Sequence, residues 1–121
     1  MDTILIVDDS STVRKFLIHT LKTKSFKCIE ASDGFDALEK LAQNPEINLI
    51  ISDLNMPNMD GIEFTRKARE LPKFKFTPII VLTTESQGSK MNEGKEAGAT
   101  GWIVKPFDTE KLLATIKKIA G

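Results

Sequence analysis

The sequence is poor in cysteine, lacks a long apolar run and carries no excess of charge of either sign. Its single cysteine, Cys28, has no partner in the chain for an internal disulfide, which fits a reducing cytoplasm. No apolar stretch approaches the roughly 20 residues that a membrane helix requires. The first residues also lack the basic and then apolar pattern of a signal peptide. These absences predict a cytoplasmic protein that does not enter a membrane.

The charged residues balance, with 17 Lys and Arg against 17 Asp and Glu and a formal net charge of zero. A balanced charge provides no general attraction to nucleic acid or to an anionic membrane surface. We therefore expect neither as a partner. With 121 residues the chain has the length of one ordinary domain, which can bury a hydrophobic core without cross-links. We expect a single domain over residues 1–121, with no output domain attached.

Apolar segments and amphipathic segments alternate five times along the chain. The apolar segments are hydrophobic at consecutive positions, which is typical of parallel strands that helices cover on both faces. The sequence therefore predicts an α/β fold, with a doubly wound, five-stranded parallel sheet and five helices. The expected strands are 3–8, 26–31, 48–53, 78–83 and 100–104. Helices are expected at 12–24, 61–70, 86–98 and 108–120. A further helix, which carries Ala37, Leu38 and Leu41 and stops near Asn44, is expected after a turn at 32–34.

Charged and polar side chains stand where four of the five predicted strands end. Asp8 and Asp9 end the first strand, Asp53 the third and Thr83 the fourth, and Lys105 follows the fifth. Because the carboxyl ends of parallel strands meet at one edge of the sheet, where such folds bind ligands, these residues should converge. A lone Asp after a strand is usually a turn or capping residue, but this joint arrangement indicates a functional site.

The residue types at this edge favour phosphoryl chemistry with a divalent cation. Asp8, Asp9 and Asp53 would repel one another, and Mg2+ relieves such repulsion through oxygen ligands. The cluster lacks a second His or a Cys group, so zinc and iron are poor candidates. An Asp can attack a phosphoryl group to form an aspartyl phosphate. Lys105 would neutralise charge on the phosphoryl oxygens and Thr83 would donate a hydroxyl proton.

Asp8-Asp9, Asp53 in the segment DLNMPNMDG, Thr83 and Lys105-Pro106 resemble the response-regulator receiver family in order and spacing. The resemblance extends over essentially the whole chain and is greatest to the CheY-like stand-alone chemotaxis regulators. It implies one receiver domain over residues 1–121, a flavodoxin-like fold and the strand order 2-1-3-4-5.

The resemblance also implies roles for individual residues. Asp53 is then the phosphoacceptor for a histidine kinase, in a two-component system, with Mg2+ as the cofactor. The metal ligands are Asp8, Asp9, Asp53 and the backbone carbonyl of Asn55. Lys105 contacts the phosphoryl group, and the Lys105-Pro106 bond is cis.

Further roles concern signal transmission. Thr83 moves toward the phosphoryl group and Trp102 turns inward behind it, which makes these two residues the switch. Asn55 and Glu85 occupy positions that tune dephosphorylation in the family. Thr84 departs from the family pattern, which frequently has Ala or Gly there, and we expect its branched side chain to hinder entry of the phosphoryl donor.

The output surface is expected on helix 86–98, strand 100–104 and helix 108–120, and a flagellar motor switch is the leading target. Helix 86–98 is a poor helix because Gly88 and Gly94 each cost about 1 kcal/mol relative to Ala. A weak element beside the site is a candidate for the part that shifts. On this interpretation the chain is a signalling module and no enzyme, although it catalyses its own phosphorylation and dephosphorylation.

Three alternatives stay open. The first is a phosphorelay shuttle or a phosphate sink of the same family. The second is an Mg2+-dependent phosphatase with an aspartate nucleophile, as in the haloacid-dehalogenase-like enzymes. Those enzymes have a DxD pattern after the first strand, whereas this chain has adjacent Asp8-Asp9 followed by Ser10. The third is flavin binding through Ser10, Ser11 and Thr12, which the neighbouring carboxylates disfavour.

Overall fold

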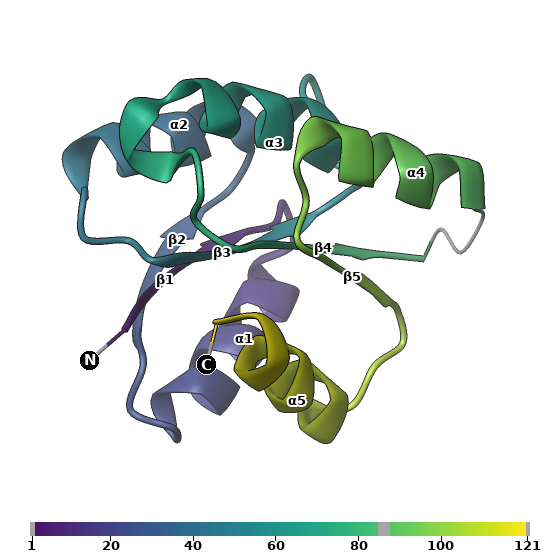
Figure 1. Cartoon of the computed structure of the whole chain (residues 1–121). Coiled ribbons are helices and arrows are strands. Elements are labelled where there is room, and N and C mark those ends of the chain that lie inside the picture. The colour runs from purple at the N-terminus through teal and green to yellow at the C-terminus, as the bar shows by residue number, and fades with distance from the viewer. Residues whose placement is uncertain (1, 85–87, 121) are drawn as a thin grey trace.

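The computed structural model describes residues 2–84 and 88–120 (Figure 1). Within these residues five strands alternate with five helices, and one short 3-10 helix, η1, precedes the fourth strand. The strands are β1 (Thr3–Val7), β2 (Lys27–Ala31), β3 (Leu49–Asp53), β4 (Ile79–Thr83) and β5 (Gly101–Val104). The helices are α1 (Ser11–Lys22), α2 (Gly34–Gln43), α3 (Gly61–Glu70), η1 (Pro72–Phe74), α4 (Gly88–Ala97) and α5 (Thr109–Ala120).

All five strands form one parallel sheet in the order β2-β1-β3-β4-β5. Helices α2, α3 and α4 cover one face of this sheet, and α1 and α5 cover the other (Figure 1). Both the predicted doubly wound α/β fold and the strand order implied by the resemblance are therefore confirmed. No helix in the described ranges has the length and apolarity needed to cross a bilayer.

Consecutive apolar residues in the central strands pack into two separate hydrophobic cores, one on each face of the sheet. Leu5 and Ile50 point into the core beneath α2 and α3, whereas their neighbours Ile6 and Ile51 point toward α1 and α5. This division follows from the two-residue period of a strand, which sends successive side chains to opposite faces. Every residue of β1, β3 and β4 is buried. The continuous apolar runs thus position the strand ends rigidly, and the functional side chains with them.

Side-chain caps decide where several helices begin. Ser10 Oγ accepts from the Val13 N–H at 3.3 Å, so Ser10 caps α1 and Ser11 is its first residue. Asp33 Oδ1 accepts from the Asp36 N–H at 2.7 Å, which starts α2 at Gly34, within the predicted turn at 32–34. The turn signal at 32–34 hides this cap, because Asp favours turns and helix caps alike.

Arg69, near the end of α3, ties together three segments beside the sheet. Its Nη1 donates to the carbonyl oxygens of Phe74 and Thr77, at 2.7 and 2.6 Å. Its Nε and Nη2 donate to the carbonyl oxygen of Gly98, at 3.1 and 2.8 Å. Burial lowers the pKa of this guanidinium. One side chain therefore fixes the end of α3 to the entry of β4 and to the turn between α4 and β5.

We expect Arg69→Lys to lower the free energy of unfolding by about 2 kcal/mol, because an ammonium cannot reproduce the planar fork and leaves buried carbonyls unpaired. Arg66→Lys is the matched control, since Arg66 lies exposed on the same helix. Urea denaturation followed by circular dichroism measures both variants. Equal midpoints for the two would contradict this role of Arg69.

Candidate functional site

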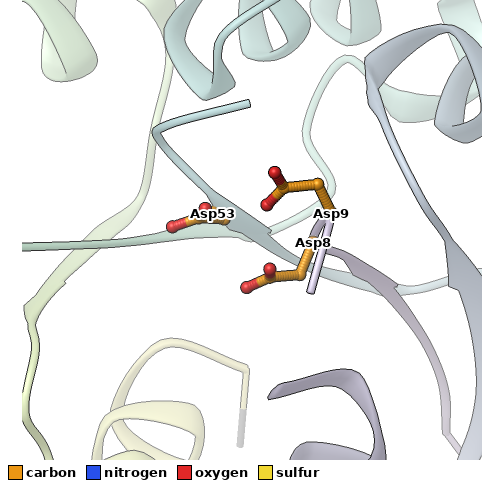
Figure 2. Close-up of side chains that lie close together, drawn as sticks. All are labelled: Asp8, Asp9 and Asp53. Carbon is orange, nitrogen blue, oxygen red and sulfur yellow. The ribbon is translucent and has the colours of Figure 1, made fainter. Parts of the chain in front are cut away.

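Three carboxylates meet at the carboxyl end of the sheet (Figure 2). Asp53 is the last residue of β3, and Asp8 and Asp9 follow β1, the neighbouring strand. Asp8 is 2% exposed and Asp53 is 6% exposed, whereas Asp9 is exposed. One oxygen from each residue lies within 4.8 Å of the others. The predicted convergence of these three residues is confirmed.

One oxygen of the Asp8 carboxylate accepts a hydrogen bond and the other does not. Its Oδ1 accepts from the Ser10 N–H at 2.8 Å. Its Oδ2 is buried and accepts no hydrogen bond. Burial is the largest cause that raises the pKa of Asp8, and the charges of Asp53 and Asp9 raise it further, against the lowering effect of Ser10 and Lys105. A buried carboxylate oxygen with no donor, beside two more carboxylates, is a fitting ligand for a hard cation.

Lys105 provides the positive charge of the cluster. Its Nζ lies 3.0 Å from Asp53 Oδ1 and 3.7 Å from Asp8 Oδ2. Only the first contact is a hydrogen bond. The Lys105 N–H donates to the Thr83 carbonyl at 2.7 Å, and the Lys105-Pro106 bond is cis. The end of β5 is thus fixed to β4, and the ammonium reaches both buried carboxylates.

Two supporting residues were not identified from the sequence. Gly61 begins α3 so close to Asp53 that a Cβ there would clash with the Asp53 carbonyl oxygen, and its N–H donates to Leu54 at 2.8 Å. Only glycine fits this contact. Its position directly after the capping residue Asp60 is the sequence signal by which Gly61 could have been found. Arg14 donates a hydrogen bond to the Asp8 carbonyl oxygen and forms an ion pair with Glu30. Local sequence patterns do not reveal the long-range ion pair.

The other predicted residues lie around the cluster. Thr83 is fully buried at the end of β4, one residue beyond Leu82, which is opposite Asp53 in the sheet. Asn55 is exposed in the loop that follows Asp53. Trp102 is half-buried on β5 and packs against the cluster of Leu54, Ile62, Val81 and Ala97. Glu85 lies outside the described residues.

An apolar groove of about 590 Å³ opens beside Lys105, between α1 and the segments that follow β4 and β5. Phe16 forms part of its wall and is 48% exposed. Thr84 is also exposed on this wall, as expected for a residue at the mouth of the crevice. The remaining lining residues are Thr12, Val13, Lys105, Pro106 and Phe107.

The same fold occurs in known proteins. Residues 4–117 match the response regulator receiver domain family. The chain is 37% identical to chemotaxis protein CheY1 of Helicobacter pylori, over 98% of this chain and 96% of that protein. It is 35% identical to a CheY homolog of Campylobacter jejuni, over 98% and 92%. The crystal structure of CheY4 from Vibrio cholerae has a TM-score of 0.94 and 46% identity, and the match covers 98% of both chains.

The chain therefore belongs to the response-regulator receiver family, as the sequence motifs indicated. Members of this family are phosphorylation switches in two-component systems and generally depend on Mg2+. They are signalling proteins that work with histidine kinases and downstream targets. Within the family, this chain is similar to the CheY proteins over nearly its whole length.

We expect Asp8→Asn to raise the free energy of unfolding in metal-free buffer by about 1–2 kcal/mol, because it removes a buried charge that lacks a hydrogen bond on Oδ2. If Asp8 holds the cation, added Mg2+ should stabilise the wild type but not the variant. Urea denaturation with and without Mg2+ measures both effects. Glu39→Gln, an exposed site on α2, is the control. Equal stabilisation of Asp8→Asn and wild type by Mg2+ would exclude Asp8 as a ligand.

Proposed function

We propose that this protein is a phosphorylation switch that accepts a phosphoryl group on Asp53 from a histidine kinase, with Mg2+ as cofactor. The observation that carries this proposal is the contact of Lys105 Nζ with Asp53 Oδ1, at 3.0 Å, beside the carboxylates of Asp8 and Asp9. A single buried carboxylate at the end of a central strand is thereby placed between a fixed ammonium and two further acids.

In the proposed reaction a carboxylate oxygen of Asp53 attacks the phosphorus of a phosphohistidine. An O–P bond forms, the P–N bond breaks, and the imidazole leaves with the electron pair and takes up a proton. Phosphoryl transfer requires mainly alignment and neutralisation of the oxygens. Lys105 performs part of this neutralisation, and Thr83 donates its hydroxyl proton to a phosphoryl oxygen after it moves toward the group.

Asp8, Asp9 and Asp53, with the carbonyl oxygen of Asn55, fit the preference of Mg2+ for oxygen ligands. When bound, Mg2+ supplies charge neutralisation and orientation for the phosphoryl oxygens. The chain's own residues do the rest, because they hold the nucleophile, position Lys105 and limit access of water. In this sense the protein catalyses its own phosphorylation and dephosphorylation, and Asn55, Thr84 and Glu85 tune the rates.

The relatives suggest the pathway and the partners. The proteins named CheY in Helicobacter and Campylobacter are chemotaxis proteins, and we assign this chain to chemotaxis by that similarity. Its downstream target is then a protein, and a flagellar motor switch is the leading candidate. The output surface comprises α4, β5 and α5, and Thr83 and Trp102 connect it to Asp53. We further propose that residues 1–121 form a single receiver domain that acts in the cytoplasm.

Incubation with acetyl phosphate and Mg2+ tests this function. We expect intact-mass spectrometry to show a gain of one phosphoryl group that disappears with chelator and in Asp53→Asn. Asp60→Asn is a control, because Asp60 caps α3 through the Glu63 N–H and is not among the proposed ligands. A gain that persists in Asp53→Asn would overturn the assignment of the acceptor. Steady turnover of simple phosphomonoesters would instead favour the phosphatase alternative.

We expect Thr84→Ala to speed phosphorylation by acetyl phosphate several-fold. Thr84 is exposed at the groove beside Lys105, so removal of its branched side chain widens the path of a small donor. The rate is measured from the time course of the phosphorylated mass. Thr12→Ser, at another residue that lines the groove, controls for small changes in groove volume. An unchanged rate in Thr84→Ala would count against crowding.

A further inference from the structure

The indole of Trp102 occupies space that only a glycine at position 94 leaves free. A Cβ on Gly94 would lie 2.6 Å from Trp102 Cζ3 and 3.0 Å from Cε3. Such distances are too short for carbon atoms in contact, which are optimal near 3.5–4.0 Å. Gly94 and Ala97 are the buried residues of α4. The ring of Trp102 therefore lies directly against the backbone of α4, at one of its two points of burial.

Trp102 also lies on the face of the sheet that carries Thr83. In the register of β4 and β5, Trp102 is opposite Val81 and Thr83 is opposite Val104. Residues two apart on a strand share a face, so Thr83 is the diagonal neighbour of Trp102. Leu54, which directly follows Asp53, belongs to the same cluster as Trp102. The indole thus stands between α4 and the strand ends that form the site.

We propose that Gly94 is a positioning residue. The absence of a Cβ at this position leaves a notch in α4 that holds the indole of Trp102. The shape of the α4–β5 surface therefore depends on whether the indole occupies this notch. This inference rests on the proposed switch and specifies how the signal reaches that surface. Trp102 borders a small groove of about 60 Å³. An indole that leaves the notch therefore changes this groove and uncovers the α4 backbone. The other residues of the groove are Met91, Lys95, Ala99, Thr100 and Gly101.

Gly88 is a control that distinguishes a notch for Trp102 from a general weakness of α4. It also lies in α4, but a Cβ there would have no atom within 4 Å. Replacement of either glycine by alanine raises the helix propensity. If the two glycines served only to weaken α4, both replacements would stabilise the protein. If Gly94 forms a notch, Gly94→Ala displaces the indole and Gly88→Ala does not.

The first experiment uses unphosphorylated protein without Mg2+, so it does not depend on phosphorylation of Asp53. Tryptophan emission and acrylamide quenching report the surroundings of Trp102, the only tryptophan of the chain. We expect Gly94→Ala to change the emission maximum and the quenching constant, whereas Gly88→Ala matches the wild type. Wild-type fluorescence in Gly94→Ala would overturn the proposal.

The second experiment asks whether the clash with the indole is the cause. We expect Gly94→Ala to lower the urea midpoint in the wild-type background, and to raise it when combined with Trp102→Ala. The same effect of Gly94→Ala in both backgrounds, measured by circular dichroism, would contradict the notch.

The third experiment connects the notch to the switch. With acetyl phosphate and Mg2+, Gly94→Ala should gain the same phosphoryl mass as the wild type and show a smaller change in emission. A full-size change in emission would exclude Gly94 from the switch. Absence of the mass gain in the wild type would refute the proposed function, while the results on unphosphorylated protein would still decide whether the notch exists.

Discussion

The contact of Lys105 with two buried carboxylates is the interaction on which the site depends. Carboxylates that lose water at the end of a central strand are unfavourable unless a cation faces them. In the described part of the chain Lys105 is the side chain that forms ion pairs with Asp8 and Asp53. It satisfies Asp53 by a hydrogen bond and leaves Asp8 Oδ2 without one. The folded protein therefore has an excess of negative charge at this edge of the sheet, and under the proposed function a divalent cation would offset it.

The fold maintains this unfavourable arrangement through the apolar strands beneath it. Ile6, Ile51 and Ile80 lie side by side across β1, β3 and β4, and none of them is exposed to solvent. Full burial of each such side chain contributes about 1.5–3 kcal/mol. This burial offsets part of the cost of gathering charges at the edge. Because the strands are buried on both faces, a shift of one strand end would disturb two cores at once. The geometry of Asp8 and Asp53 is stiff for that reason.

Sequence patterns predicted most of the fold and the centre of the site, because both depend on short-range regularities. Consecutive apolar residues indicated parallel strands, and the rule that ligands bind at carboxyl strand ends brought Asp8, Asp53 and Lys105 together before any coordinates. The same reasoning could not find contacts made by shape across distant segments. The packing of Trp102 on Gly94 is one, since the glycine was interpreted only as a weak point of its helix. The set of hydrogen bonds that Arg69 donates is another. Its acceptors are backbone carbonyl oxygens, which every residue has, so no sequence pattern identifies them.

These shape-dependent contacts all lie on the face of the sheet that α3 and α4 cover. Gly61 brings α3 against the backbone of Asp53, and Arg69 at the other end of α3 holds the turn after α4. Helix α4 itself buries only Gly94 and Ala97, so little apolar side-chain surface holds it on the sheet. A change at Asp53 would therefore meet fully buried structure in β3 but a helix with few buried side chains at α4. Under the proposed switch, the response would therefore be a displacement at α4 and β5, on the surface where Trp102 is exposed in part.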